Sequence, residues 1–222
     1  MSAELVTATA ERPAMRALAT VLDVLAEIYL QPDADVREKA ARLADDERLA
    51  GAEFESLAVD LRFLGNAPAG ELEIEYVRLF LHGRPVTAHP YESFYRGGQL
   101  LDEACLDDLE ALLAAAGVEP GGNRVTPDHL GVELDFLALL VAGLADEDLE
   151  QRQREAVRHL AERLLFDHLT GFVEAFVARV QASEPDPYHQ AATQLLADAV
   201  AAATRMIPVL STRPDGEPLH NS

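Results

Sequence analysis

The sequence predicts an all-α fold, a helical bundle of about 9–11 helices. Apolar residues make up 49% of the 222 residues, aromatic residues make up 6% and tryptophan is absent, so burial must rely on Leu, Ala and Val. That composition favours helices over sheets. Apolar positions recur at helical spacing along most of the chain. No segment alternates as a strand would and no fixed-period repeat indicates a solenoid, so one compact helical unit is expected.

In the N-terminal half, the first predicted helix carries apolar residues at helical spacing from Ala14 to Tyr29 and ends at the polar segment Gln31–Asp33. Glycine and proline residues then separate three further predicted helices, at 35–49, 53–64 and 71–81. The segment His82–Pro90 holds two prolines and one glycine. Because a proline favours extended backbone in the residue before it, we expect a structured loop there.

The middle of the chain contains a predicted linker. Helices are expected at 91–101 and 106–116, and Gly117 is expected to end the second as a left-handed cap. Residues 117–126 include Pro120, Gly121 and Gly122, which predicts a hinge or linker. The expected organisation is a single domain with an N-terminal helical part, the linker, a C-terminal helical part and a loose tail, at about 14–116, 117–126, 127–206 and 207–222.

The C-terminal half begins with a strong predicted helix start. Thr126 can cap the helix, Pro127 suits its first position and Asp128 complements the positive end of the helix dipole. The apolar stripe of this helix consists of Leu130, Leu134, Leu137, Val141 and Leu144. Two more helices, with a bend near 167–171, are expected over 149–180. The pair Asp186-Pro187 then predicts the start of a last helix that runs through residue 206.

Charge and composition exclude several classes of function. Lys and Arg number 18 against 39 Asp and Glu, and the formal charge of −21 disfavours binding to a nucleic-acid backbone or an anionic membrane. The longest apolar run, Phe136–Ala145, is too short to span a membrane. The N-terminus lacks the basic and apolar regions of an export signal. Cys105 is the only cysteine, which excludes an intrachain disulfide and fits a reducing cytoplasm.

Residues that could carry catalysis are few. The sequence contains no nucleophile elbow, phosphate-binding loop, dinucleotide-binding glycine motif or zinc-protease motif. His129 and Glu133 lie four residues apart on one predicted helix. They could be two metal ligands on one face, a local capping pair together with Asp128, or part of a binding site. Cys105 is expected to be a small buried side chain that is inert for lack of an activating base.

Six apolar or aromatic side chains lie within twenty residues around the predicted loop, namely Tyr76, Leu79, Phe80, Tyr91, Phe94 and Tyr95. Composition alone allows two interpretations of this group. It could belong to the hydrophobic core, or it could line a groove for a ligand.

Three sequence blocks resemble the signature of the TorD/DmsD/NarJ family of redox-enzyme maturation chaperones. In the order and spacing of the family, they are Glu75–Phe80 (EYVRLF), Pro90–Arg96 (PYESFYR) and Pro127–Leu137 (PDHLGVELDFL). A fourth, weaker match is Phe166–Leu169 (FDHL), after which the family often has a tryptophan and this chain has Thr170-Gly171-Phe172. The resemblance covers roughly residues 18–202.

The resemblance implies a chaperone rather than an enzyme, with no cofactor and no metal. Chaperones of this family bind the apo catalytic subunit of a molybdopterin oxidoreductase of the DMSO reductase type, together with its N-terminal twin-arginine signal peptide, until the cofactor is inserted. The implied localisation is the cytoplasm, with no bound nucleic acid and no stable membrane association. A monomer or a domain-swapped dimer, exchanging helices through the linker at 117–126, is expected.

The resemblance also implies where the signal peptide binds. The apolar floor of the site would consist of Leu79, Phe80, Tyr91 and Tyr95, with Tyr76 and Pro90 from the same blocks beside it. Recognition of the peptide's arginines would fall to Glu92, Asp128 and Glu133, with His129 as a hydrogen-bonding partner. Because a carboxylate can bind a guanidinium through two parallel hydrogen bonds, lysine should not fully replace arginine in the peptide.

Three alternatives remain open on the sequence. Within the family, the chain could be a NarJ-like assembly factor for a molybdoenzyme that is not exported. A metal-dependent hydrolase would instead use His129, Glu133 and a third ligand. A purely structural helical adaptor would use the acidic surface only for solubility.

Overall fold

A computed structural model describes residues 3–30, 34–49, 54–67, 72–82, 86–97, 100–118 and 125–207. Its α-helices are α1 (Ala3–Leu30), α2 (Ala34–Ala44), α3 (Glu55–Asn66), α4 (Leu72–Tyr76), α5 (Glu92–Gly97), α6 (Glu103–Ala115), α7 (Leu130–Leu144), α8 (Gln151–Arg163), α9 (Thr170–Gln181) and α10 (Pro187–Met206). Shorter helical turns are η1 (Glu47–Leu49), η3 (Val77–Leu81) and η4 (Leu164–Leu169), the last two with π-helical hydrogen bonding. The described residues form no strand, and the predicted all-α bundle is confirmed.

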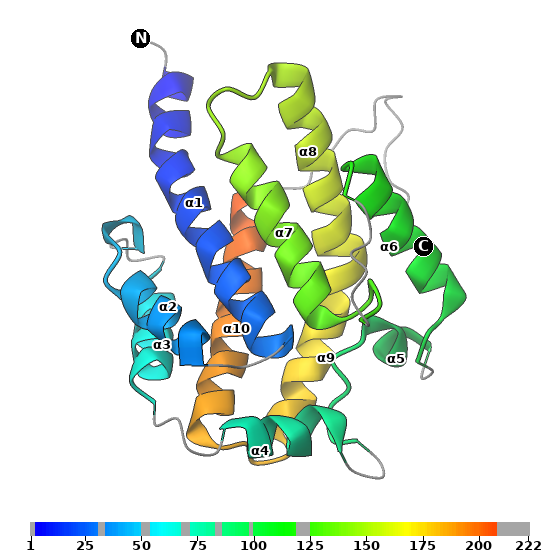
Figure 1. The fold of residues 1–222 in the computed structure, drawn as a ribbon. Coiled ribbons are helices and arrows are strands. Elements are labelled where there is room, and N and C mark those ends of the chain that lie inside the picture. The colour runs from blue at the N-terminus through cyan, green and yellow to red at the C-terminus, as the bar shows by residue number, and fades with distance from the viewer. Residues whose placement is uncertain are drawn as a thin grey trace.

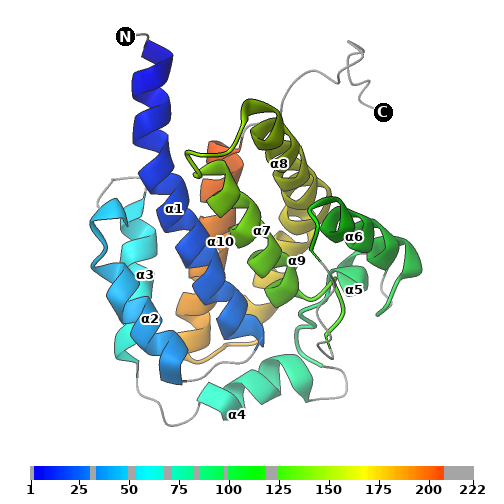
Figure 2. The same cartoon turned by 45° about the horizontal axis from the view of Figure 1, so that its top comes forward.

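Helices α1, α7 and α10 form the centre of the bundle. Helix α1 packs along α7, and α10 lies behind them both (Figure 1). On one side, α2 and α3 pack together, and α3 reaches α10. On the other side, α8, η4 and α9 follow one another, and α5 and α6 lie outermost (Figure 2). The short α4 covers one end of the molecule. Segments from both halves of the chain therefore share one core.

An aromatic cluster fills the core where the two halves meet. The ring centroid of Tyr29 lies 5.8 Å from that of Phe80 and 5.5 Å from that of Phe176, and Phe80 stacks on Phe176 at 5.8 Å. All three side chains are at most 3% exposed. Each offset or edge-to-face pair of this kind stabilises the fold by about 0.5–1.5 kcal/mol, in addition to the stabilisation from burying apolar area.

Several predicted boundaries differ from those observed. Helix α1 begins at Ala3 rather than Ala14 and includes Pro13. Helix α5 ends at Gly97, short of the predicted residue 101, and Leu101 itself has a φ of 64° that a helix does not accommodate. Gly117, with a φ of 73°, has the predicted left-handed conformation. Residues 119–124 of the predicted linker and 208–222 of the predicted tail lie outside the described residues, so the domain organisation stays a prediction.

The predicted start of α7 is wrong by three residues. The helix begins at Leu130, and its N-cap is His129, whose Nδ1 accepts a hydrogen bond from the backbone N–H of Gly131. Neither Thr126 nor Pro127 is part of the helix, because the backbone here pairs with a distant segment instead. The apolar stripe predicted for α7 is correct, since every residue named in it is buried.

Candidate functional site

Two of the motif blocks are joined by backbone hydrogen bonds. Tyr91 and His129 form an isolated antiparallel bridge. The N–H of Glu92 donates to the carbonyl of Asp128 at 2.8 Å, and the N–H of Leu130 donates to the carbonyl of Pro90 at 2.8 Å. We call this pairing of residues 90–93 with residues 128–130 the clasp. It brings together side chains that are far apart in the sequence.

Asp128 holds the clasp from inside. Its side chain is fully buried and accepts a hydrogen bond from the Ser93 hydroxyl at 2.5 Å and another from the Thr126 hydroxyl. Ser93 is itself fully buried and also accepts from the N–H of Leu101 at 3.0 Å. Hydrogen bonds to a buried charged group are stronger than those between neutral groups, so Asp128 fixes the segment that precedes α7.

His129 is neutral in this arrangement. Its Nδ1 is occupied as a hydrogen-bond acceptor, its side chain is 5% exposed, and burial lowers its pKa to about 4. The ring of Tyr91 packs edge-on against the imidazole, with centroids 4.9 Å apart. The capping interpretation of His129 is therefore confirmed.

Glu133 lies one turn into α7 and has no hydrogen-bond partner among the residues that the structure describes. The side chain is 1% exposed, and neither carboxylate oxygen has a hydrogen bond within the described part of the chain. Burial, and then the charges of Glu92 and Asp128, raise its pKa well above the ordinary value. The expectation that Glu133 pairs locally is wrong, because the side chain points into the protein rather than along the helix surface.

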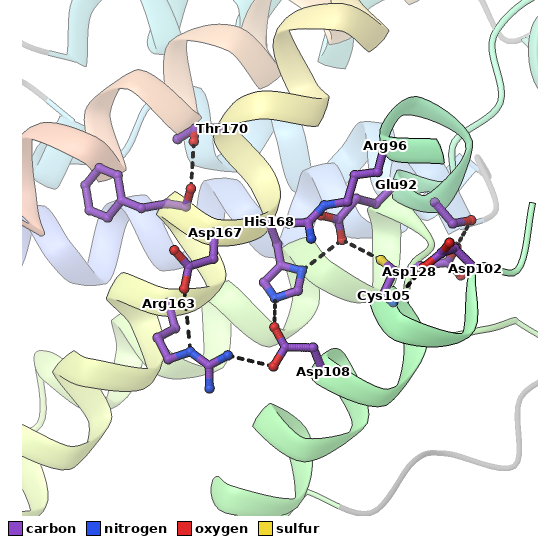
Figure 3. A network of polar contacts seen from close by, with 12 residues as sticks. Glu92, Arg96, Asp102, Cys105, Asp108, Asp128, Arg163, Asp167, His168 and Thr170 are labelled. Atoms are coloured by element: carbon purple, nitrogen blue, oxygen red, sulfur yellow. Dashed lines mark hydrogen bonds and ion pairs between the residues drawn. The ribbon is translucent and has the colours of Figure 1, made fainter. Parts of the chain in front are cut away.

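Glu92 lies at the centre of a polar network (Figure 3). Its Oε1 lies 2.5 Å from Nε of Arg96, and its Oε2 lies 2.9 Å from Nδ1 of His168 and accepts from the Cys105 thiol at 3.2 Å. Burial alone would raise the pKa of Glu92, but the hydrogen bond and charge of His168, with Arg96, hold it below the ordinary value. Asp108 continues the network, since its Oδ2 lies 3.1 Å from Nε2 of His168.

The predicted apolar floor divides into two groups. Leu79 and Phe80 are at most 3% exposed and belong to the core. Tyr76 is buried too, and its hydroxyl donates to the carbonyl of Tyr29 at 2.6 Å. Tyr91 and Tyr95 are only partly buried. In this conformation a ligand can therefore reach the two tyrosines of the second block but not Tyr76, Leu79 or Phe80 of the first.

A pocket of about 350 Å³ adjoins the clasp, between α5 and the η4–α9 segment. Its lining includes Tyr95, Arg96, Phe166, Asp167, His168 and Phe172. The hydroxyl of Tyr95 is buried and lacks a hydrogen-bond partner among the described residues. No role for His168 or Phe172 was predicted from the sequence, although the weaker fourth motif block lies in this region. Two other hollows, of about 450 Å³ between α1 and α7 and 600 Å³ between α3 and α10, contain none of the predicted site residues.

Comparison with a solved structure defines the class of the fold. A redox enzyme maturation protein from Archaeoglobus fulgidus superposes with a TM-score of 0.56, covering 81% of this chain and 91% of that protein, at 21% sequence identity. In the described part of the chain, no helix is both long and apolar enough to cross a membrane.

Sequence comparisons then define the family. Residues 42–178 match the family model described as nitrate reductase delta subunit. A chaperone protein TorD from Vibrio cholerae is 30% identical over 165 residues, which cover 73% of this chain and 74% of the relative. Another from Vibrio parahaemolyticus is 32% identical over 134 residues, covering 59% and 62%. The chain belongs to the TorD/NarJ family of maturation chaperones. Its relatives are chaperones rather than enzymes, as the motif blocks predicted.

Proposed function

We propose that this protein is a cytoplasmic chaperone that binds the N-terminal signal peptide of a molybdopterin oxidoreductase catalytic subunit of the DMSO reductase type. It holds the apo subunit until the cofactor has been inserted, so that an empty enzyme is neither exported nor assembled. One observation carries the proposal. Three of the motif blocks, 90–96, 127–137 and 166–169, meet at the clasp and at the pocket beside it.

The apolar part of the peptide fits the accessible side of this region. Tyr91 and Tyr95 are partly buried, and Phe166 and Phe172 extend the apolar surface into the pocket. The hydroxyl of Tyr95, which is buried and finds no partner among the described residues, can donate to a peptide carbonyl. Burial of a Leu-sized side chain stabilises a complex by about 1.5–3 kcal/mol. Because ordering the peptide offsets part of this gain, a Kd of about 1 μM is expected.

We assign recognition of the arginines to the buried carboxylates of the clasp. Asp128 is saturated by two hydroxyl groups and Glu92 is paired with Arg96, whereas Glu133 has no partner in the part of the chain that the structure describes. A guanidinium would satisfy both oxygens of Glu133. Because Glu133 is 1% exposed, contact requires the clasp hydrogen bonds to open, which couples arginine binding to a movement of the segment before α7.

Calorimetric titration with the signal peptide of the partner enzyme tests this proposal. The partner is first identified by copurification with the tagged chaperone. We expect Tyr95→Ala to weaken binding about tenfold, as loss of a buried aromatic contact does. Phe63→Ala is the matched control, because Phe63 is 46% exposed on α3, away from the clasp, and should leave the affinity unchanged.

Two further titrations test the arginine assignment. Replacing the arginine pair of the peptide by lysines should weaken binding to the wild type, and Glu133→Gln should remove most of that difference. If Tyr95→Ala and Asp128→Ala both bind with wild-type affinity, the assigned site is wrong.

A second candidate function follows from the family model. Its description as a nitrate reductase delta subunit favours an assembly factor for an enzyme that stays on the cytoplasmic side and needs no export signal. The copurified partner decides between the two, since an N-terminus without adjacent arginines would favour the assembly factor.

A further inference from the structure

Three potential metal ligands meet inside the protein next to the clasp. Glu92 comes from α5, Cys105 from α6 and His168 from η4, and each is at most 3% exposed. One ligand atom of each lies within 4.8 Å of the other two. Oε2 of Glu92 lies 3.2 Å from the Cys105 sulfur and 2.9 Å from Nδ1 of His168. Ligand atoms around a tetrahedral zinc ion lie about 3.5 Å apart, so small outward shifts would admit an ion.

The imidazole is oriented as metal-binding histidines are. Nε2 of His168 faces Oδ2 of Asp108 at 3.1 Å, and Asp108 is held by Arg163, whose Nη2 donates to Oδ1 at 2.6 Å (Figure 3). A bound ion would displace the proton between Nδ1 of His168 and Oε2 of Glu92, while Nε2 keeps its proton and donates it to Asp108, so the lone pair of Nδ1 would be directed at the ion. A carboxylate that accepts from the outer nitrogen of a histidine fixes its tautomer and strengthens it as a ligand.

The two carboxylate oxygens of Glu92 have different partners. Arg96 contacts Oε1, which leaves Oε2 directed towards the sulfur and the imidazole. Only one carboxylate oxygen is therefore available, as monodentate binding to a small ion requires.

The surrounding charge favours a cation as well. Burial, and then Glu92 and to a smaller extent Glu133, raise the pKa of the Cys105 thiol, and the buried side chain of Glu133 has no hydrogen-bond partner among the described residues. A buried carboxylate without a partner is costly. A divalent cation beside it would offset that cost and favour the thiolate form of Cys105.

We infer that Glu92, Cys105 and His168 form a binding site for one divalent metal ion, with zinc preferred. A set of thiolate, imidazole and carboxylate ligands suits zinc better than the hard cations magnesium and calcium. The fourth position is left for water. The inference does not depend on the proposed function, and it departs from the metal-free protein that was expected from the sequence.

The position of the site indicates a structural role. Helix α6 lies at the edge of the molecule (Figure 1). A bound ion would connect α6 through Cys105 to α5, which carries half of the clasp, and to η4, which lines the pocket. Metal binding would therefore stabilise the side of the protein that we assign to the peptide.

Cobalt titration of the reduced, chelator-treated full chain tests the inference directly. Because Cys105 is the only cysteine, a thiolate-to-cobalt charge-transfer band can arise only from this site. We expect the band to saturate at one equivalent, with visible bands of tetrahedral intensity, and one equivalent of zinc to abolish it. Saturation without a thiolate band, or no stoichiometric binding of either metal, would overturn the inference.

Variants separate this site from adventitious binding. Cys105→Ser should abolish the band, and His168→Gln should weaken cobalt binding about 100-fold or more. Asp108→Asn, which weakens the outer hydrogen bond to His168 and removes the ion pair with Arg163 but none of the three ligands, should weaken it about tenfold. His159→Gln is the matched control, because His159 is exposed on α8 and should change nothing. Circular dichroism verifies that each variant is folded, and a band that survives in folded His168→Gln would contradict the assignment.

Discussion

Two segments of this chain have similar sequences but different structures. Residues 186–189 (DPYH) and 126–129 (TPDH) each combine an aspartate, a proline and a histidine where the sequence predicts a helix start. At α10, Asp186 accepts from the N–H of His189 at 2.8 Å, and Pro187 is the first helical residue, as the local rules predict. At α7, Asp128 instead accepts hydrogen bonds from the hydroxyls of the distant Ser93 and the neighbouring Thr126. His129 is the residue that caps the helix.

The difference lies in what each segment contacts. Nothing diverts the side chain of Asp186 from the helix it caps. Asp128 instead meets the Pro90–Ser93 segment, and the two hydrogen bonds between the backbones hold residues 127–129 outside the helix. The helix start predicted from local sequence is therefore wrong at the place where two motif blocks of the family meet. Departures from local sequence preference are expected at functional sites.

The largest difference should appear when the two aspartates are replaced. Asp128→Ala leaves the buried hydroxyl of Ser93 without its acceptor and removes two charge-assisted hydrogen bonds, so we expect a loss of about 3 kcal/mol in the free energy of unfolding. Asp186→Ala removes an ordinary cap and should cost about 1 kcal/mol. Urea denaturation followed by circular dichroism measures both. Equal losses would mean that the clasp adds nothing beyond capping.

The next effect concerns the first turn of α7. A Cβ at Gly131 would lie 2.6 Å from Cγ of Leu30 and 2.9 Å from the carbonyl oxygen of Ala26, so Gly131→Ala should force α7 away from α1 and cost about 2 kcal/mol. Gly171 in α9 is the matched control. A Cβ there meets nothing within 4 Å, and Gly171→Ala should stabilise the protein by about 0.5–1 kcal/mol. Thermal melts of the two variants should shift in opposite directions, and a neutral Gly131→Ala would contradict the close packing.

Features of this fold that depend on local pattern could be predicted from the sequence. The stripe of α7, the Asp186-Pro187 helix start and the left-handed Gly117 all follow from spacing and residue type. What depends on distant partners could not be predicted. Cys105 was expected to have no basic neighbour, yet Glu92 and His168 reach it from other helices. Composition likewise could not distinguish a groove from a core for Leu79 and Phe80, which the structure buries.

The smallest effect is a pH dependence at the cap of α7. Burial lowers the pKa of His129 from 6.5 to about 4, so between these values the unfolded chain binds a proton that the folded chain does not. The contribution of His129 to the free energy of unfolding is therefore lost as the pH falls from 6.5 towards 4. At pH 5.5 the loss should be roughly 1 kcal/mol relative to pH 7.5.

His129→Asn keeps a capping side chain and cannot titrate, so it should flatten the dependence. Urea denaturation of wild type and variant at several pH values measures the difference between them. Parallel pH curves for the two proteins would show that His129 is accessible to protons in the folded state.

The central claim is that the clasp and its pocket bind the signal peptide, and photocrosslinking tests it most directly. Benzoylphenylalanine placed at Tyr91, at Tyr95 and, as a control, at Phe63 on α3 is irradiated with the peptide of the copurified molybdoenzyme. We predict crosslinks from positions 91 and 95, competed by excess unlabelled peptide, and none from position 63. Competed crosslinks from position 63 with none from 91 or 95 would contradict the claim.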